Sequence, residues 1–270
     1  MSELEAAEAK LRTEDVLCTP NSAASARHIL SLSTQSRQEQ VNALCHFCHC
    51  DLGNLVRCAL VAGISADARD ADGCPAICHA ARRGSLKALQ ALLDGRADVN
   101  AAESSSGAAP LLLAVANSKL ECVRALVVAG ADARAAATAD ANTPLLEAII
   151  SKQLEAVRAL LPVSDLAACN AEGRSALHLA VAGGGGAVFD TLLPLVTDVD
   201  LCTRRSAPGR AFDQTALHLA CVMGRDDLVA ALLLRRASWY KKDSEACTPL
   251  YYAAIYGHWS CLRLWLTTPS

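Results

Sequence analysis

This chain of 270 residues has few aromatic residues, little excess of charge of either sign and no long apolar run. Aromatic residues make up 4% of it although 52% is hydrophobic, so any core must be built from small aliphatic side chains. The 25 basic and 28 acidic residues leave a net charge of −3, which gives no indication of binding to nucleic acid or to a membrane surface. No run reaches about 18 uncharged apolar residues, so we expect no membrane span.

Signals for export and for catalysis are missing as well. Residues 1–5 (MSELE) are acidic and open no apolar segment, so they do not form a signal peptide. Thirteen cysteines in a chain of this length without an export signal favour reduced thiols. We therefore expect the cytoplasm, with the nucleus as the alternative. Because nucleophile elbows, phosphate-binding loops, kinase motifs and zinc-protease motifs are absent, we predict neither an enzyme nor a cofactor.

An internal repeat is the main feature that is present. Six related segments begin at residues 75, 109, 143, 175, 215 and 248, at steps of 34, 34, 32, 40 and 33 residues. The clearest copies are TPLLEA at 143–148, SALHLA at 175–180, TALHLA at 215–220 and TPLYYA at 248–253. An apolar pair follows every start at a fixed distance, as in Leu92 and Leu93. These shared offsets predict one structural unit that recurs along the chain.

Each unit has the signals of two short helices. Thr or Ser at the first position can cap a helix, and Pro next to it suits the first turn. A glycine nine residues later, such as Gly84 or Gly224, can end this helix with a positive φ. The second helix carries apolar residues at helical spacing, as in Leu86, Leu89 and Leu92. One such pair cannot bury its own apolar face, so the units must stack.

These segments resemble ankyrin repeats, whose pattern is Gly-x-Thr-Pro-Leu-His-x-Ala-Ala-x-x-Gly, then a longer helix ending in Leu-Leu, then Gly-Ala-Asp-Val-Asn. The end of this pattern is present as GRADVN at 95–100 and GADA at 130–133. The resemblance implies an all-α solenoid of helix-turn-helix units with hairpin-like loops, about seven repeats in all. The predicted units are 39–70, 71–104, 105–138, 139–170, 171–202, 203–243 and 244–270, after an N-terminal leader or helical cap at 1–38 with helices near 3–12 and 24–32.

Two parts of this pattern are irregular. In the degenerate first unit we expect helices at 41–53 and 55–63. Glycine is replaced between the helices by Ser118 and Lys152, and at an earlier loop position by Ala141, Asp213 and Ala246. We expect the units with these replacements to be less stable.

The resemblance also implies a non-catalytic scaffold that binds a protein partner through its concave face and its hairpin tips. Mapped by register, the partner-binding candidates are Arg82, Arg83, Asn117, Arg174, Arg204, Arg205, Arg210, Phe212, Met223, Tyr240, Lys241, Lys242 and Tyr256. Residues 203–256 combine the longest loop with most of the aromatic residues, so we hypothesise that they form the main partner surface and that the partner is acidic. A flexible insertion with ordinary solvated charges is the alternative.

Other functions are compatible with the same repeats. One is a substrate-recruiting adaptor of a ubiquitin ligase, or a regulatory module of a larger assembly. The helix expected at 258–266 is apolar on several sides, which predicts either self-association or a neighbouring segment that covers it.

A metal or redox-thiol site at residues 45–50 (CHFCHC) is the third alternative, because five soft ligands occur within six residues. On a helix, Cys45, Cys48 and His49 share a face and are the metal candidates. A second pair of ligands is not evident in the sequence, so inert, packed cysteines are the favoured interpretation.

Three further polar residues occupy positions to which the family gives a role. The resemblance implies that His178 and His218 form structural hydrogen bonds between neighbouring loops. Asn100 follows Asp98 and Val99 in a pattern similar to the one that an asparaginyl hydroxylase modifies in ankyrin repeats. The favoured interpretation of Asn100 is a loop residue that bridges adjacent turns.

Overall fold

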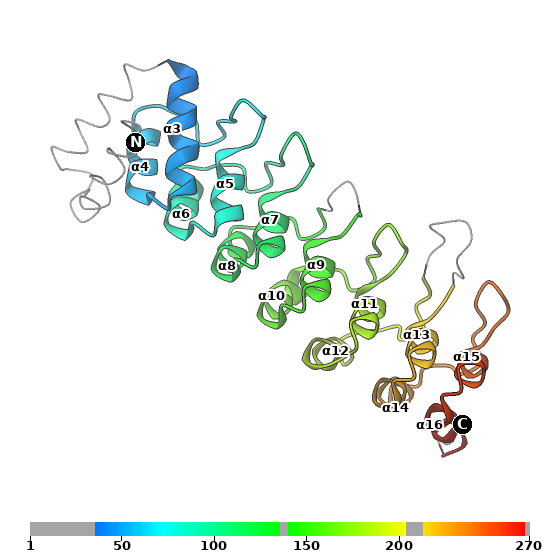
Figure 1. Ribbon diagram of the computed structural model, residues 1–270. Helices are drawn as coiled ribbons and strands as arrows, with labels where there is room; N and C mark the ends of the chain where they lie inside the picture. The colour runs from blue at the N-terminus through cyan, green and yellow to red at the C-terminus, as the bar shows by residue number, and fades with distance from the viewer. Residues whose placement is uncertain (1–35, 136–139, 204–212, 268–270) are drawn as a thin grey trace, which may run out of the picture. The chain divides into compact units, whose positions relative to one another are not determined.

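The computed structural model describes residues 36–135, 140–203 and 213–267, and the regular elements in these ranges are helices (Figure 1). Isolated β-bridges join Arg69 to Pro75 and Cys169 to Ser175, where each pair closes a loop. None of the described helices has the length and apolar character needed to cross a membrane. The helices predicted at 3–12 and 24–32 lie outside the described residues. The all-α prediction is confirmed.

The chain divides into two compact units, Met1–Asp132 (unit 1) and Ala133–Ser270 (unit 2). In unit 1, α3, α5 and α7 pack against one another in succession, and α4, α6 and α8 form a second layer behind them (Figure 1). The loops that precede α5 and α7 extend from the first of these layers. The helices are α3 (Arg37–His49), α4 (Gly53–Val61), α5 (Ala76–Arg83), α6 (Leu86–Asp94), α7 (Pro110–Ala116) and α8 (Leu120–Val128).

Unit 2 repeats this arrangement with α9, α11, α13 and α15 in succession, each packed against the helix that follows it. The predicted stack of helix pairs is thereby confirmed within each unit. The elements are α9 (Pro144–Ile150), α10 (Leu154–Leu160), the 3-10 helix η1 (Leu161–Val163), α11 (Ala176–Ala182), α12 (Ala187–Leu192), α13 (Ala216–Val222), α14 (Asp226–Leu234), α15 (Pro249–Ile255) and α16 (Trp259–Thr267).

The first helix pair lies closer to the N-terminus than the sequence indicates. The predicted helices at 41–53 and 55–63 are found at Arg37–His49 and Gly53–Val61. The earlier start has a local cause, because the Ser36 side chain accepts a hydrogen bond from the Glu39 backbone while the Glu39 carboxylate accepts one from the Ser36 backbone. This reciprocal capping box stabilises the first turn.

Small side chains allow neighbouring first helices to pack closely. One alanine recurs five residues after each repeat start and is buried in every copy: Ala80, Ala114, Ala148, Ala180, Ala220 and Ala253. Leucines at the apolar pair fill the space behind, and Leu92, Leu126, Leu160, Leu192 and Leu232 are fully buried. A larger ring at the alanine position would separate adjacent helices, which explains how a chain this apolar can contain so few aromatic residues.

The backbone keeps its left-handed turns where glycine is missing. Ser118 and Lys152 have φ of 56° and 55° between their helices, and Ala141, Asp213 and Ala246 have φ of 50°, 62° and 59° in their loops. The equivalent Gly84 has φ of 82°. A side chain in this conformation costs roughly 1–2 kcal/mol relative to the right-handed one, so the fold imposes the turn against local preference.

Ala246→Gly is therefore expected to stabilise unit 2. Alanine has no polar group to support a left-handed backbone, so its removal should raise the free energy of unfolding by about 1 kcal/mol. Urea denaturation of the full chain followed by circular dichroism measures this. Gly257→Ala is the matched control, since Gly257 has φ of 71° and an added methyl group would meet no atom within 4 Å. The control should lower the stability by a similar amount, and a shift of both variants in one direction would contradict the explanation.

Candidate functional site

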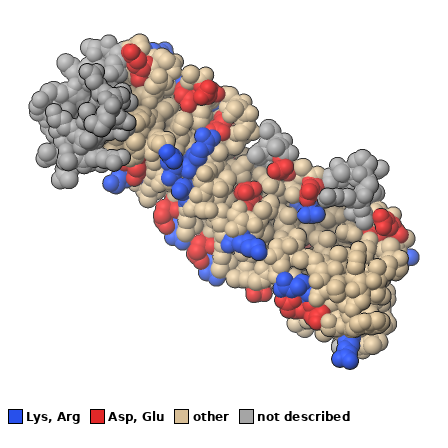
Figure 2. Space-filling view, in the orientation of Figure 1, with Lys and Arg blue, Asp and Glu red and all other residues tan. Residues whose placement is uncertain are grey.

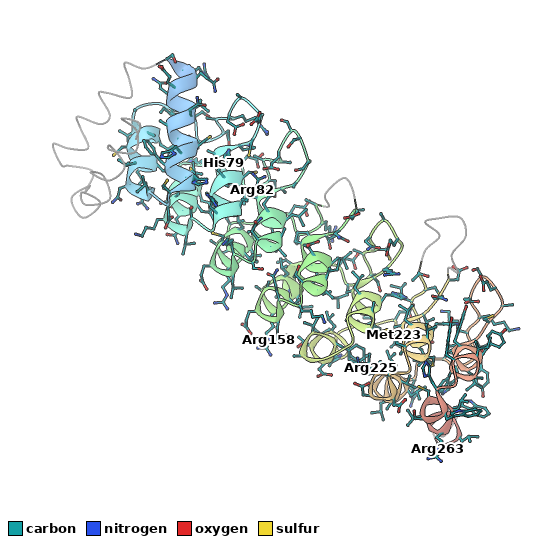
Figure 3. The ribbon with its side chains drawn as sticks, viewed as in Figure 1. His79, Arg82, Arg158, Met223, Arg225 and Arg263 are labelled. Carbon is teal, nitrogen blue, oxygen red and sulfur yellow. The ribbon has the colours of Figure 1, made fainter. Side chains whose placement is uncertain are left out.

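An aromatic patch lies on α13 and α15 of unit 2 and consists of Met223, Tyr252, Ile255 and Tyr256. Met223 is the C-cap residue of α13 (Figure 3) and is 42% exposed, while Tyr256 is the C-cap residue of α15 and is 55% exposed. The rings of Tyr252 and Tyr256 stack with centroids 6.4 Å apart and planes 10° from parallel. The patch therefore presents large apolar surface to solvent in a defined geometry.

A hydrogen-bond network holds Tyr252 in place. Its hydroxyl donates to Oδ2 of Asp243 over 2.7 Å, and the amide of Gln214 approaches the same carboxylate at 3.4 Å. Burial disfavours ionisation of Asp243, but hydrogen bonds from Tyr252 and from the Cys247 backbone outweigh it and lower the pKa of Asp243. Burial and this carboxylate raise the pKa of Tyr252, so its hydroxyl remains a donor. The centre of the patch is thus fixed before any partner binds.

His178 and His218 connect neighbouring loops, as the resemblance implies. Nε2 of His178 donates to the Gln214 carbonyl over 2.9 Å, and its Nδ1 accepts from the Ser175 hydroxyl at 2.7 Å. His218 is bonded in the same way, to the Cys247 carbonyl over 3.2 Å. Burial lowers the pKa of His178 to about 4 and also lowers that of His218. Both rings are therefore neutral near pH 7 and act as structural donors.

The loops of unit 2 carry the other predicted partner residues. Tyr240 and Lys242 are exposed, whereas Nζ of Lys241 donates to the Asp200 carbonyl over 2.7 Å. Trp239 is one of the aromatic residues of the segment 203–256 that the sequence indicates as the partner surface, but its side chain is buried. The predicted residues Arg204, Arg205, Arg210 and Phe212 lie outside the described residues.

Arg174 belongs to a groove rather than to the patch. The groove has a volume of about 410 Å³ and is lined by Asp140, Asn142, Asn170, Glu172 and Arg174, among others. Nη1 of Arg174 pairs with the Glu172 carboxylate at 3.2 Å, which neutralises its charge there.

In unit 1 the predicted partner residues already have partners inside the unit. Arg82 forms an ion pair with the buried carboxylate of Glu103. Nε of Arg83 donates to the His49 ring over 2.6 Å, and Nδ2 of Asn117 donates to the Leu113 carbonyl over 2.8 Å. A protein partner would have to replace these bonds, or accept further hydrogen bonds from the same three side chains.

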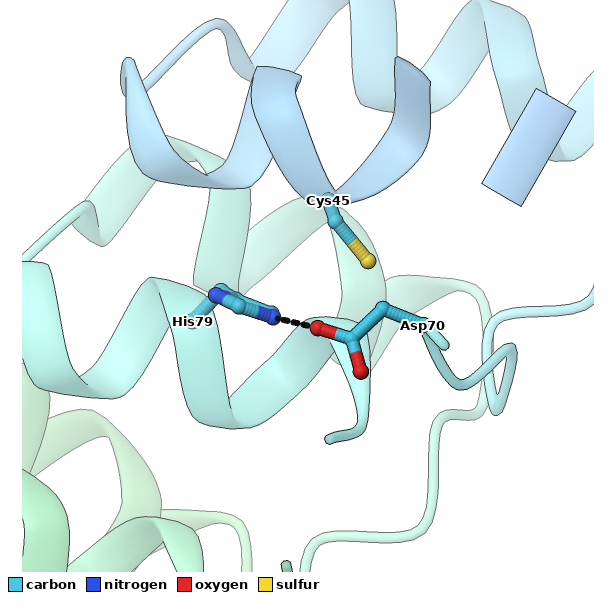
Figure 4. A group of neighbouring side chains, drawn as sticks. All are labelled: Cys45, Asp70 and His79. Carbon is cyan, nitrogen blue, oxygen red and sulfur yellow. Dashed lines mark hydrogen bonds and ion pairs between the residues drawn. The ribbon is translucent and has the colours of Figure 1, made fainter. Parts of the chain in front are cut away.

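The residues of the cysteine-rich segment lie in three different environments. Cys48 is fully buried and its pKa is raised by burial, which is typical of an inert core thiol. His49 lies on the surface beside Arg83. Sγ of Cys45 instead lies within 4.8 Å of ligand atoms of Asp70 and His79 (Figure 4). Local helix spacing could not indicate this group, because its other members belong to the next loop and to α5.

Asp70 and His79 form a partly buried ion pair. Nε2 of His79 donates to Oδ2 of Asp70 over 2.7 Å, while Oδ1 accepts from the backbone of Cys74 at 2.8 Å. Hydrogen bonds with the thiols of Cys45 and Cys74 and with Asp70 outweigh burial and raise the pKa of His79 to about 11. The Cys78 thiol and the His79 ring lower the pKa of Cys74, although burial and Glu103 oppose them.

Asn100 bridges adjacent loops. Its Oδ1 accepts a hydrogen bond from the Asp132 backbone at 2.8 Å. Asp67 makes the equivalent bond to the Asp98 backbone at 2.7 Å, and Asp200 to the Ser238 backbone at 2.9 Å. These bonds support the structural interpretation of Asn100, and its hydroxylation stays a prediction.

Surface charges of both signs are interspersed. In the view of Figure 2, Lys and Arg side chains lie next to Asp and Glu side chains rather than in separate areas. Several are paired within one helix or loop, as in Arg158 with Glu155 at 3.1 Å and Arg225 with Asp227 at 2.9 Å. The face shown in Figure 2 therefore gives no indication of a strongly acidic partner.

Comparison with known proteins gives one family. The family model for ankyrin repeats matches residues 41–137, 111–203 and 188–268. A crystal structure of the human ASB11 ankyrin repeat domain is similar with a TM-score of 0.65 and 19% identity, over 84% of this chain and 98% of that one. At this identity the likeness concerns the fold.

Curated relatives match only in part. A probable E3 ubiquitin-protein ligase of rice (Oryza sativa subsp. japonica), XBOS31, is 38% identical over 90 residues, which is 33% of this chain and 19% of the relative. A second rice protein of the same description, XBOS32, is 34% identical over 91 residues, or 33% and 17%. Inversin of the dog (Canis lupus familiaris) is 45% identical over 53 residues, or 20% and 5%. The matches thus span less than a fifth of each relative.

Proposed function

The chain belongs to the ankyrin repeat family, and on that premise we propose that it is a non-catalytic protein-binding scaffold whose main contact surface is the aromatic patch. Ankyrin repeats are in general interaction modules rather than catalytic domains. The single observation that carries the proposal is the exposed ring of Tyr256 stacked on the fixed ring of Tyr252, with the exposed Met223 at the end of the packed neighbouring helix α13.

The patch offers a large contact area that is already partly ordered. Tyrosine buries a large rigid surface at low entropic cost, and methionine adapts its shape to a partner. Because Asp243 already holds Tyr252, little ordering free energy remains to be lost on binding. We infer that the patch takes an apolar side chain or an apolar segment of a protein partner. The loop residues Tyr240 and Lys242 would form its rim.

The double variant Met223→Ala/Tyr256→Ala is expected to weaken partner binding by about thirtyfold or more, because central aromatic contacts typically contribute 2 kcal/mol or more. Both side chains are substantially exposed, so the fold should persist. The measurement is affinity capture of the full chain from its native extract, with quantitative mass spectrometry of the retained proteins.

Leu234→Ala is the matched control, since Leu234 lies at the end of α14 in the same unit and is 86% exposed. A partner is accepted when the original chain and the control retain it equally and the double variant loses it. Equal retention of every captured protein by all three would refute the patch as the contact surface.

A recruiting role in ubiquitin ligation is a second proposal. Its support is that two of the partial relatives are described as probable E3 ubiquitin-protein ligases. The same capture experiment tests it, because ligase subunits should copurify with the chain. Their absence while other partners are retained would exclude this role without affecting the first proposal.

A further inference from the structure

Three different metal-ligand atoms meet in unit 1 (Figure 4). Sγ of Cys45, a carboxylate oxygen of Asp70 and a ring nitrogen of His79 all lie within 4.8 Å of one another. They belong to α3, to the loop before α5 and to α5, so tertiary packing assembles the group. Among the residues that the structure describes, this is the one group of three or more such ligands.

We propose that Cys45, Asp70 and His79 bind a single Zn²⁺ ion, with a water molecule as the fourth ligand. Thiolate, imidazole and carboxylate are the side chains that zinc prefers, and three protein ligands with one open position form a common zinc arrangement. Binding releases two protons to solvent, one from the Cys45 thiol and one from the His79 ring, because both groups must be deprotonated to coordinate.

The geometry requires only small side-chain movements. Ligand atoms of a tetrahedral zinc site are roughly 3.3–3.7 Å apart, given metal–ligand bonds of 2.0–2.3 Å. The 2.7 Å contact between Asp70 and His79 has to widen, and the thiol has to approach. The side chains of Asp70 and His79 are 18% and 22% exposed, which leaves them room to rotate and lets an ion enter. Cys45 is buried and fixes the inner side of the site.

Unit 2 contains the same three positions with different chemistry. His218 lies six residues before Gly224, which has φ of 64°, just as Cys45 lies six residues before Asp51, which has φ of 58°. Asp243 and Tyr252 correspond to Asp70 and His79 within their loops and helices. There the hydroxyl of Tyr252 bonds to Asp243, and His218 bonds to a backbone carbonyl. The polar groups of unit 2 are thus hydrogen-bonded without an ion. A hydrogen bond between these two positions can therefore be formed without metal ligands, and the cysteine, aspartate and histidine of unit 1 are not needed for it.

Cys74 and Cys78 lie near the site but do not belong to the group of ligand atoms within 4.8 Å of one another, and each has a hydrogen-bond acceptor of its own. The thiol of Cys74 donates to Oε1 of Glu103 over 3.2 Å, and that of Cys78 donates to the Ala101 carbonyl over 3.2 Å. We therefore leave both out of the ligand set. Their variants are unsuitable as controls because both lie beside His79.

The test is titration of the purified full chain with Co²⁺, whose bond to a thiolate gives charge-transfer absorption in the near ultraviolet. The original chain should bind one equivalent with this absorption, and Zn²⁺ should displace it. Cys45→Ser should lose the absorption. Asp70→Asn and His79→Gln should weaken binding by at least about tenfold, because even groups that only orient a ligand contribute that much.

Two choices keep the result interpretable. Asp70→Asn preserves the loop, since Asn170 at the equivalent position accepts the same backbone hydrogen bonds from Glu172 and Arg174. Cys122→Ser removes a buried thiol of α8 in the same unit and should leave binding unchanged. If Cys45→Ser fails to fold, the two other variants decide, provided their circular dichroism is unaltered. Undiminished absorption in folded Cys45→Ser, or no saturable binding by the original chain, would overturn the proposal.

Discussion

Phe189→Ala is expected to lower the free energy of unfolding by about 3–5 kcal/mol, the cost typical of removing a buried phenylalanine. Phe189 is among the largest fully buried side chains and lies in α12 between Val188 and Leu192, which face the same core. A domain is stable by only about 5–15 kcal/mol, so this change removes a large part of the total.

The position matters because α12 is short and, besides Phe189, buries only Val188 and Leu192. The helix has six residues and begins after Gly186, which offers no side-chain cap. Its preceding turn contains Gly184, Gly185 and Gly186, all with positive φ, which lose much chain entropy on folding. Burial of the Phe189 ring is therefore the main local source of stability.

Urea denaturation at a fixed pH measures the effect, and Phe189→Leu is the control that keeps an apolar side chain. We expect the leucine variant to lose clearly less than the alanine variant. A loss below about 1 kcal/mol in Phe189→Ala would show that α12 is held by contacts other than this ring.

Acidification is expected to destabilise unit 2 between pH 6.5 and pH 4, by about 3 kcal/mol through His178 alone. The folded chain keeps this ring neutral with a pKa of about 4, while the unfolded chain protonates it near pH 6.5. Stability is thus complete above the unfolded pKa and is lost as the pH falls through this window. His218 contributes in the same direction.

Other groups titrate outside that window or with the opposite sign. The pKa of Asp243 is lowered, so its contribution is lost at more acidic pH. The pKa of His79 is raised to about 11, so its favourable ion pair is fully present below pH 6.5 and is lost only as the pH rises toward 11.

Free energies of unfolding of the original chain and of His178→Gln at pH 7.5, 6 and 4.5 test this prediction. The variant should be less stable at pH 7.5 but should lose less on acidification, with the remaining slope due to His218 and to other groups whose pKa is lowered, such as Cys74. An unchanged pH dependence in the variant would contradict the assignment to His178.

The repeat itself could be predicted from the sequence because its signals are local. Thr143 caps α9 by accepting from the Leu146 backbone, and Pro144 occupies the first turn, as the pattern of that unit indicates. The start of α3 differed because the capping box of Ser36 and Glu39 lies before the region of repeat similarity. Trp239 shows that composition alone does not determine exposure, since its loop turns the ring inward.

The candidate sites were harder to predict because neighbouring repeats contribute to each of them. Cys45 was identifiable as a possible ligand, but Asp70 and His79 lie 25 and 34 residues further along and share no local motif with it. Register supplies the missing information, since consecutive copies of one position face each other in a stack. Register also predicts Met223 and Tyr256 as partner residues, and this stays a prediction.

The bonds between loops also bear on how the chain folds as it is synthesised. The link from Asn100 to Asp132 spans 32 residues, that from Asp67 to Asp98 spans 31, and that from His218 to Cys247 spans 29. Each link closes over about one repeat, so its loop-closure entropy is small and does not increase with the length of the array. A helix pair can therefore dock as soon as the following pair has left the ribosome, and the nascent chain exposes little more than one unfinished repeat at a time.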